Sequence, residues 1–556
     1  MPGGPALTPF NWLLAAAPLL IMLAAMLGLR LRGTHAGMLG FALAAALAQI
    51  GFGTLPAVLV VAAVRGLAVS FHVLYIIWAA LLLYRLAEEV GAIRSIGEGV
   101  ARLTEDHILQ LLILGFAFAS FLQGVAGFGV PVAIVAPLLV GLGFPPVQAA
   151  VVPLVGHAWS VTMGDMASSF QALRAVTGLP AARLGLWTAL FLGLACLLTG
   201  FAIAHIHAGP RPFRRTFGAI VALGLAMGGT QAVLALLQHW IIASFAAGMV
   251  GLVMSLALAR MARAPRGRRF WGLLPHWPGH DEERATAGAG ARVQAGGGPG
   301  GGHSRGSGGA PAMGFHMAFA AYYVLIVVVV LATLLPPVHH LLLGWAVTVP
   351  FPATRTLLGW AVPEGSFVLH PLEHPGGLLS YTVAIAYLIY RAAGYWTPGR
   401  GRAVVGLVVA EGVPTSLAIV AMVMMAMVMT YSGMTFLLAK GIAAVTGPLY
   451  PLLAPFIGLL GAVVTGSNTN SNVLFGALQR DAALVLDLDP VVMAALQTTG
   501  GSLGSMVAPA KVLLATATVG LAGREGEVIG ITFRYCLLMV AMAGVLGWAL
   551  LTVVLR

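Results

Sequence analysis

The sequence predicts an all-α polytopic membrane protein with about 11–14 transmembrane segments, in two repeats that each hold a re-entrant hairpin and a broken helix. Three observations predict this fold. The 556 residues are 59% hydrophobic and 8% charged, with a mean hydropathy of +0.96, whereas a soluble protein carries about 25% charged residues. Apolar runs long enough to cross a bilayer recur along the chain. Two breaks rich in glycine and hydroxyl residues interrupt this pattern, one in each half.

The apolar runs differ in length, and this separates full spans from shorter elements. Runs of about 20 residues are expected to cross as helices, namely 11–29, 35–55, 67–84, 107–122, 184–205, 217–235, 238–259, 317–336, 379–391, 414–437 and 531–554. Shorter or interrupted runs, where re-entrant hairpins and broken helices are expected, cover 129–143, 147–163, 340–360, 449–464, 472–487 and 491–507. The first run has no charged segment before it and no small-residue cleavage site after it, so we expect a retained span.

Composition divides the chain into four parts. Residues 1–106 hold N-terminal spans and, at 86–106, an amphipathic interfacial helix. Residues 107–260 form the first repeat half and residues 315–556 the second, each with a hairpin and a broken helix. Residues 261–314 between them start basic, turn acidic and are then dominated by Gly, Ala and Ser. That composition cannot bury a core, so it predicts a flexible cytoplasmic linker.

The net charge of +12 comes from arginines that gather between the apolar runs. They are Arg30 and Arg32; Arg85, Arg94 and Arg102; Arg211, Arg214 and Arg215; and the arginines from Arg260 to Arg269. Basic loops of this kind mark the cytoplasmic side, which leaves the N-terminus outside. The excess charge therefore indicates membrane topology and not a nucleic-acid partner. Cys196 and Cys536 lie far apart in apolar runs, so we expect neither a disulfide nor a metal site.

The two breaks predict where a ligand binds. The first covers residues 123–131 (QGVAGFGVP) and the second residues 465–472 (TGSNTNSN). Polar and glycine-rich backbone at membrane depth persists only where it is buried in protein or lines a cavity. After each break an apolar stretch leads to a proline, Pro146 or Pro490, and then to a small-residue interruption at 162–166 or 502–506. This internal repeat is typical of secondary transporters with a binding site near the bilayer centre.

Interrupted helices present free N–H groups and a positive dipole end, which suits an anion without a formal cation. The expected substrate-binding residues are glycines, hydroxyls and amides of the breaks together with one lysine: Gly127, Gly129, Ser467, Asn468, Thr469, Asn470, Ser471, Asn472, Gly500, Gly501, Ser502 and Lys511. Lys511 would attract a carboxylate, or else extend to the lipid headgroups. Single glycines and serines have the alternative of close helix packing.

Ionisable groups inside the membrane are candidates for proton coupling. His157 and Asp165 lie eight residues apart around the first interrupted helix. Their alternatives are a hydrogen-bonded structural histidine and a helix cap. The chain contains no Walker motif and no His-Glu-x-x-His pattern. We therefore expect no enzyme, no cofactor and no ATP-driven transport, which leaves an ion gradient as the energy source.

At these breaks the chain resembles the L-lactate permease family of bacterial monocarboxylate transporters. The matching stretches are 124–143 (GVAGFGVPVAIVAPLLVGLG), 431–434 (YSGM), 455–479 (PFIGLLGAVVTGSNTNSNVLFGALQ), 500–520 and Gly523. The resemblance extends over most of the chain apart from the linker, and it places site residues at Gly124, Gly127, Gly129, residues 467–472, Gly500, Gly501 and Pro509.

The resemblance implies proton-coupled symport of L-lactate, glycolate or similar 2-hydroxy acids by a multi-pass protein of the bacterial inner membrane. It also implies an elevator-type motion, and by analogy a homodimer. The chain departs from the family pattern at residues 157–162 (HAWSVT), which are more polar than usual, and at Ala510-Lys511, where a Gln-Ser pair is expected. Both departures lie where substrate is expected, so they leave open which carboxylate is carried.

Three alternatives remain. A sodium-coupled transporter of another organic anion would hold the ion with backbone carbonyls of the broken tips. A channel would conduct net current without counterflow exchange. A membrane-embedded transferase would need a paired-carboxylate or His/Asp site, and the tight pair Asp487 and Asp489 is more simply a helix cap.

Overall fold

The computed structural model describes residues 5–554 except 105, 128, 210–212, 264–312 and 398. Within these residues, eleven helices are long and apolar enough to cross a membrane, and the count is twelve if the bent pair α15 and α16 forms one span. Helices dominate because a backbone in lipid has to satisfy its own hydrogen bonds. The predicted all-α polytopic fold is confirmed. The segment expected to be a flexible linker lies almost entirely outside the described residues.

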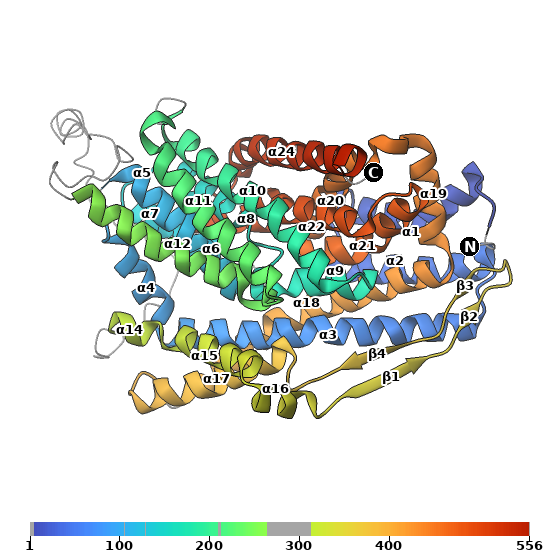
Figure 1. The fold of residues 1–556 in the computed structure, drawn as a ribbon, viewed down its shortest axis with the longest axis horizontal. Coiled ribbons are helices and arrows are strands. Elements are labelled where there is room, and N and C mark those ends of the chain that lie inside the picture. The colour runs from blue at the N-terminus through green and yellow to red at the C-terminus, as the bar shows by residue number, and fades with distance from the viewer. Residues whose placement is uncertain are drawn as a thin grey trace.

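Four long helices pack into one layer that runs the length of the molecule (Figure 1). They are α1 (Pro9–Leu27), α2 (Gly33–Phe52), α3 (Pro56–Glu89) and α18 (Arg400–Tyr431). Glycines allow the close approach, since a Cβ on Gly66 would lie 2.9 Å from the Cα of Met424 in α18. At one end of the layer Arg85 of α3 pairs with both Glu88 and Glu411. We call this layer the helical frame.

From residue 107 on, the first half of the chain begins with a hairpin and continues with a helix that is interrupted. The hairpin arms are α5 (His107–Gln110), the π-helix η1 (Leu111–Phe118) and α6 (Ala119–Val125) on one side and α7 (Val130–Gly141) on the other. The interrupted helix consists of α8 (Pro146–Ala158), a short turn η2 (Asp165–Ala167) and α9 (Ser168–Thr177). The helices α10 (Ala181–Ala208), α11 (Phe213–Leu236) and α12 (Trp240–Arg263) follow.

The second half repeats this order. After α19 (Met434–Thr446) and the turn η5 (Gly447–Leu449), the hairpin arms are α20 (Tyr450–Thr465) and α21 (Asn468–Val485). The interrupted helix consists of α22 (Pro490–Gly504), the turn η6 (Ser505–Val507) and α23 (Pro509–Thr518). The helix α24 (Glu525–Ala549) and the short π-helix η7 (Leu550–Val554) end the described chain. In Figure 1 the first hairpin lies toward the left and the second toward the right, with α8 and α22 between them.

The remaining helices lie along one side of the frame. They are α4 (Ala92–Ala101), α14 (Phe315–Ala318), α15 (Ala320–Leu334), α16 (Pro336–Leu343) and α17 (Pro375–Ala392). The helix α4 is the one expected to be amphipathic, and it buries Ile93, Ile96 and Val100 while Arg94 stays exposed.

One stretch differs from its expected structure. Residues 340–360, expected to be an interrupted apolar helix or hairpin, instead hold two short strands, β1 (Val347–Phe351) and β2 (Thr354–Arg355). These strands pair with two that follow, β3 (Ala361–Val362) and β4 (Gly365–Leu369). The pairs are antiparallel, with Val347 opposite Leu369 and Thr354 opposite Val362. Valine, threonine and phenylalanine favour strands, and Pro350 and Pro352 remove donors that a helix would need. The strands extend along α3 (Figure 1).

The expected span 414–437 is also displaced, because α18 ends at Tyr431. Gly433 follows with φ +83°, a left-handed conformation that glycine adopts without strain, and α19 begins after it. Both cysteines are fully buried, Cys196 in α10 and Cys536 in α24.

Candidate functional site

The interrupted helices of the two halves are bonded directly to each other. Thr162 Oγ1 donates to the carbonyl of Thr498 at 3.1 Å, and Ser502 Oγ donates to the carbonyl of Ala158 at 2.7 Å. In return, the backbone N–H of Thr162 donates to Ser502 Oγ at 3.2 Å. These hydroxyls satisfy backbone groups that the interruptions release. The interruptions of the two halves, at 162–166 and 502–506, therefore lie side by side at one site.

The first interruption holds three successive residues in a left-handed conformation. Asp165, Met166 and Ala167 have φ values of 50°, 51° and 61°, and all three are buried. Each such residue costs about 1–2 kcal/mol relative to a right-handed one. Strain of this kind persists only where the surroundings enforce it, and it concentrates at functional sites.

The second hairpin tip directs a helix N-terminus at the same place. The arm α20 ends at Thr465, Gly466 turns the chain with φ +72°, and Ser467 caps the first turn of α21 by accepting from the N–H of Asn470. The free N–H groups and the dipole of this 18-residue helix favour an anion.

A cavity of about 310 Å³ lies between these breaks and the helical frame. One wall comes from the two hairpin tips and from Asp165, Ser168 and Lys511. The facing wall comes from the start of α2, including Arg32 and Thr34, and from the middle of α18. The cavity thus brings two cations and one carboxylate together with many hydroxyl and amide groups, which is the pattern of a small-molecule site with a few directing polar groups.

Several oxygens at this cavity have no hydrogen-bond donor among the described residues. They are Gln123 Oε1, Asp165 Oδ1, Asn468 Oδ1 and Asn470 Oδ1, and each of these residues lines the cavity. The second carboxylate oxygen of Asp165 accepts from Ser168 Oγ at 3.1 Å. A buried acceptor without a donor is costly, so these atoms are positioned to meet a ligand hydroxyl, a proton or a cation.

Lys511 connects the cavity to His157. Lys511 lines the cavity, and its Nζ lies 3.2 Å from His157 Nε2. The other ring nitrogen, Nδ1, lies 2.6 Å from the carbonyl of Pro153. His157 itself is fully buried behind Lys511 and is not among the cavity-lining residues.

Seven of the residues expected from the sequence line the cavity: Gly127, Asp165, Ser467, Asn468, Thr469, Asn470 and Lys511. Within this group, Thr469 Oγ1 lies 2.9 Å from Ser169 Oγ, and Asn468 Nδ2 donates to Thr162 Oγ1 at 3.0 Å.

The other expected residues lie behind the cavity wall, in packing contacts. Ser471 Oγ donates to the carbonyl of Gly458, and Asn472 Nδ2 donates to the carbonyl of Ser169 and to Thr498 Oγ1. A Cβ on Gly500 would collide with the carbonyl oxygen of Pro455, and one on Gly501 would collide with Asn468. This group also includes Gly129, His157 and Ser502. Their assignment to substrate binding or coupling stays a prediction.

Sequence reasoning missed the wall that the helical frame supplies. Arg32 was expected to mark a cytoplasmic loop, yet it lines the cavity, as do Thr34 of α2 and Thr415 of α18. No local signal distinguishes it from the neighbouring Arg30. Two further cavity residues lie close to the predicted positions: Gln123 is the first residue of the break 123–131, and Ser168 lies two residues after the interruption 162–166.

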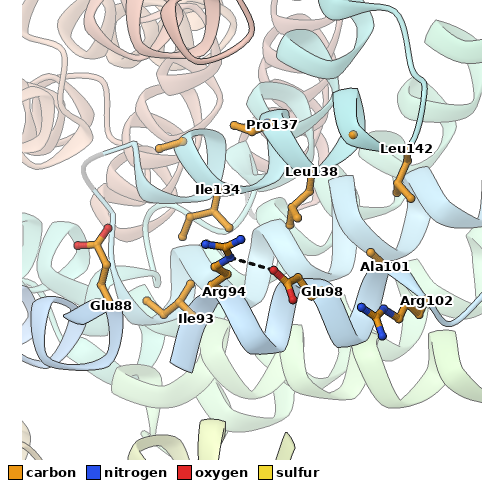
Figure 2. A pocket seen from close by; sticks show the side chains of 12 residues that line it. Glu88, Ile93, Arg94, Glu98, Ala101, Arg102, Ile134, Pro137, Leu138 and Leu142 are labelled. Atoms are coloured by element: carbon orange, nitrogen blue, oxygen red, sulfur yellow. Dashed lines mark hydrogen bonds and ion pairs between the residues drawn. The ribbon is translucent and has the colours of Figure 1, made fainter. Parts of the chain in front are cut away.

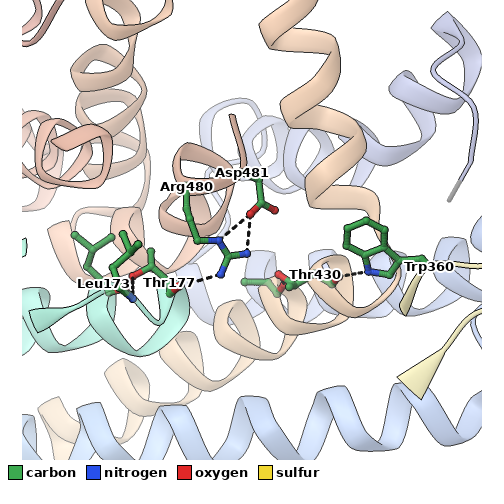
Figure 3. Close-up of polar contacts among 8 residues, drawn as sticks. Leu173, Thr177, Trp360, Thr430, Arg480 and Asp481 are labelled. Carbon is green, nitrogen blue, oxygen red and sulfur yellow. Dashed lines mark hydrogen bonds and ion pairs between the residues drawn. The ribbon is translucent and has the colours of Figure 1, made fainter. Parts of the chain in front are cut away.

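Two polar contacts hold the second hairpin and the strands in place (Figure 3). Arg480 of α21 donates to the carbonyl of Thr177, the last residue of α9, at 2.9 Å, and to Asp481 at 2.8 Å. Trp360 Nε1 donates to the carbonyl of Thr430 near the end of α18 at 3.0 Å. The hairpin is thereby fixed to the first interrupted helix, and the strand region is fixed to the frame.

A second cavity, of about 530 Å³, lies between α4 and α7 (Figure 2). Ile93, Ile134 and Leu138 form much of its wall, and Arg94 and Glu98 at its edge pair with each other at 2.9 Å. It contains no residue of either break. It is therefore a weaker candidate for a substrate site than the smaller cavity.

The chain is similar to known proteins over nearly its whole length. The model of the family described as L-lactate permease matches residues 11–555. An L-lactate permease of Escherichia coli (strain K12) is 28% identical over 560 residues, which cover 96% of this chain and 94% of that protein. The glycolate permease GlcA of the same strain is 28% identical over 565 residues, with the same coverage. An L-lactate permease of Bacillus subtilis (strain 168) is 27% identical over 495 residues, covering 84% of this chain and 83% of that protein.

The match with the family model extends from α1 through α24 and η7. The chain therefore belongs to the L-lactate permease family and is a multi-pass transporter of the bacterial inner membrane, not an enzyme.

Proposed function

We propose that this protein is a secondary active transporter that moves L-lactate, glycolate or a similar 2-hydroxy monocarboxylate together with a proton into the cell. The observation that carries the proposal is the cavity beside the helical frame that is lined by the N-terminus of α21, Lys511 and Asp165. A carboxylate binds at the helix N-terminus and near the cations, and the unpartnered oxygens of Gln123 and Asn470 accept from the substrate hydroxyl. Relatives named for lactate and glycolate support this substrate class.

The proton is held by Asp165 or His157 in this proposal. Asp165 lines the cavity with one oxygen unpartnered, and His157 reaches it through Lys511. Protonation of either group compensates the negative charge that a bound carboxylate brings into a low-dielectric site. Binding of the proton then raises the affinity for the acid anion, and binding of the anion raises the affinity for the proton, as symport requires.

We further propose that the two halves are structural repeats and that they move against the helical frame in an elevator-like motion. The order of hairpin and interrupted helix is the same in both halves. Gly156 and Gly500, each ten residues beyond the matching prolines, both pack against a carbonyl of the first arm of their own hairpin. The cavity lies between this assembly and the frame, so a displacement between them would open it to one side or the other.

Uptake by purified protein in liposomes tests this function. Labelled L-lactate is supplied with an inward proton gradient and no sodium, and saturable uptake that an uncoupler abolishes is the expected result. Asn470→Ala and Asp165→Asn are each expected to reduce it at least about tenfold, which corresponds to a loss of about 1.4 kcal/mol. Absence of uptake of both lactate and glycolate under any gradient would contradict the proposal.

A sodium-coupled carrier of another organic anion is the second candidate. The unpartnered oxygens of Asp165, Gln123 and Asn470 favour it, because oxygen ligands at interrupted helices also suit a sodium ion. The same liposomes distinguish the two: uptake that requires an inward sodium gradient and ignores the proton gradient would select the sodium carrier.

A further inference from the structure

Hydrogen-bond geometry limits the number of protons that His157 and Lys511 can hold together. A carbonyl oxygen only accepts, so the 2.6 Å contact with the Pro153 carbonyl requires a proton on His157 Nδ1. The remaining ring nitrogen, Nε2, faces Lys511 Nζ at 3.2 Å. A lysine ammonium has three donors and no acceptor. If the imidazole and the ammonium were both fully protonated, two N–H groups would point at each other, and Nε2–H would have no acceptor.

The pair therefore holds at most one proton beyond its neutral state. That proton lies either on Nζ, which then donates to Nε2, or on Nε2, which then donates to the neutral amine. Protein surrounds both side chains: His157 is fully buried and Lys511 is 9% exposed. Because a net charge without an opposite charge nearby is costly in such a place, the occupancy of this single proton depends on which anions are close.

The groups that face the pair are few. Asp165 and Arg32 are the other charged residues that line the cavity together with Lys511. Neither forms an ion pair with Lys511 among the described residues: Asp165 attracts its charge from a longer distance, and the hydrogen bond of Nζ is the one with His157. Two of its three N–H groups are thus free for an anion in the cavity, which is bounded by the N-terminus of α21.

We propose that Lys511 and His157 form one proton-holding unit, and that the substrate carboxylate binds directly to Lys511 Nζ. The inference rests on the proposed symport and makes it specific: the acid and its proton bind at the same nitrogen. A proton from water enters the pair as the carboxylate arrives, since the anion compensates the new charge. When the acid leaves, the pair returns its proton to water. His157 acts as a positioning residue that gives the amine a hydrogen-bond acceptor while the site is empty.

If the pair holds the proton, binding of the acid is coupled to uptake of a proton. Substitutions of Lys511 and His157 should change this coupling in different ways. Arginine cannot lose its proton in a protein, so Lys511→Arg carries a fixed charge. We expect this variant to keep reduced but measurable lactate counterflow and to lose accumulation driven by the proton gradient. Lys511→Met is expected to lose both. His157→Gln, whose amide oxygen can still accept from Nζ, is expected to keep both, with its optimum moved along the pH axis.

The deciding experiment measures proton uptake and lactate binding in the same detergent-solubilised samples. A pH-indicating dye reports protons taken up on addition of lactate, and labelled lactate reports binding. Above neutral pH we expect about one proton per bound lactate for the unaltered protein and for Lys440→Arg. Lys440, the other lysine of the chain, lies in α19 over the ring of Phe436 and is a matched control. Lys511→Arg should bind lactate without taking up protons.

The outcomes are distinct. If Lys511→Arg takes up protons like the unaltered protein, or accumulates lactate under a proton gradient, the proton is held elsewhere and the inference is wrong. If Lys511→Arg does not fold, His157→Gln decides, because an unshifted pH profile would equally contradict the pair. If the unaltered protein binds neither lactate nor glycolate, the proposed function fails and this inference fails with it.

Discussion

The two hairpins differ in what they present to the cavity. The first tip contributes Gly127, and its first arm is buried at every position from 108 to 125. The second tip contributes hydroxyl and amide side chains, and its first arm α20 leaves Leu453 and Leu460 exposed. The first hairpin thus presents one glycine and one amide side chain, that of Gln123, whereas the second presents a run of hydroxyl and amide side chains. A substrate held between them meets one hairpin that is enclosed by protein and one that is more peripheral.

The largest effect is expected where each interrupted helix touches its own hairpin. A Cβ on Gly156 would collide with the carbonyl of Gly115, and one on Gly500 would collide with the carbonyl of Pro455. Since backbone must shift in both, Gly156→Ala and Gly500→Ala should each cost about 3 kcal/mol of unfolding free energy. Thermal melting in detergent measures this. Gly530→Ala in α24, with open space around it, is the control, and equal melting temperatures for all three variants would contradict the packing argument.

Two asparagines of the second tip should separate structure from binding. Asn472 is fully buried, and its amide bonds α21 to Ser169 and Thr498, so Asn472→Ala should cost about 2 kcal/mol of stability. Asn470 lines the cavity with its oxygen unpartnered, so Asn470→Ala should keep its melting temperature and lose uptake. Melting and uptake are measured on the same preparations. If Asn470→Ala lowered the melting temperature and Asn472→Ala lost uptake at an unchanged melting temperature, the binding surface of this tip would lie elsewhere.

The left-handed glycines of the two tips should respond unequally to alanine. Gly129 has φ +86°, and its Cβ would lie 2.6 Å from Leu514, whereas Gly466 has φ +72° and open space. Gly466→Ala bears only the conformational cost of about 1 kcal/mol. Gly129→Ala adds a displacement of Leu514, for a total of about 2 kcal/mol. A larger drop in melting temperature for Gly466→Ala than for Gly129→Ala would show that the first tip is the more adjustable one.

The smallest effect is expected at Arg480, which joins the second hairpin to α9. Arg480→Lys keeps the positive charge beside Asp481 but cannot reproduce both contacts of the planar guanidinium. The loss of one charge-assisted bond at a partly exposed site should cost about 1 kcal/mol. Hydrogen exchange of α21 is the measurement, and faster exchange confined to this hairpin is the expected result. Unchanged exchange would mean that the Thr177 contact does not hold the hairpin.

Much of this architecture is accessible from the sequence, because membrane depth makes polar and glycine-rich breaks conspicuous. Residues 465–472 and Gly127 stand out in apolar surroundings, and residues 465–470 and Gly127 line the cavity. Contacts between distant residues are not accessible in this way. His157 and Lys511 are 354 positions apart, and no local sequence pattern predicts the contact between their side-chain nitrogens.

Arg32 is a second example of a position that could not be predicted from the sequence. Its sequence context, a short basic turn between two apolar runs, is that of a topology signal. Arg32 lies at the cavity because the start of α2 packs against the middle of α18, around Pro414 to Ile419. The sequence of neither helix predicts this contact. The strands Val347–Phe351 and Gly365–Leu369 were missed for a related reason, since an apolar run fits a strand as well as a helix segment.

The burial of both cysteines has a practical consequence for following the hairpins in motion. Cys196 and Cys536 are fully enclosed by helices, so water-soluble maleimides should react slowly with the unaltered chain. A single cysteine introduced at Gly466 or Thr34 would then report its own accessibility without removal of the native thiols. Labelling rates at these two positions, with and without lactate, would reveal to which side of the membrane the cavity opens.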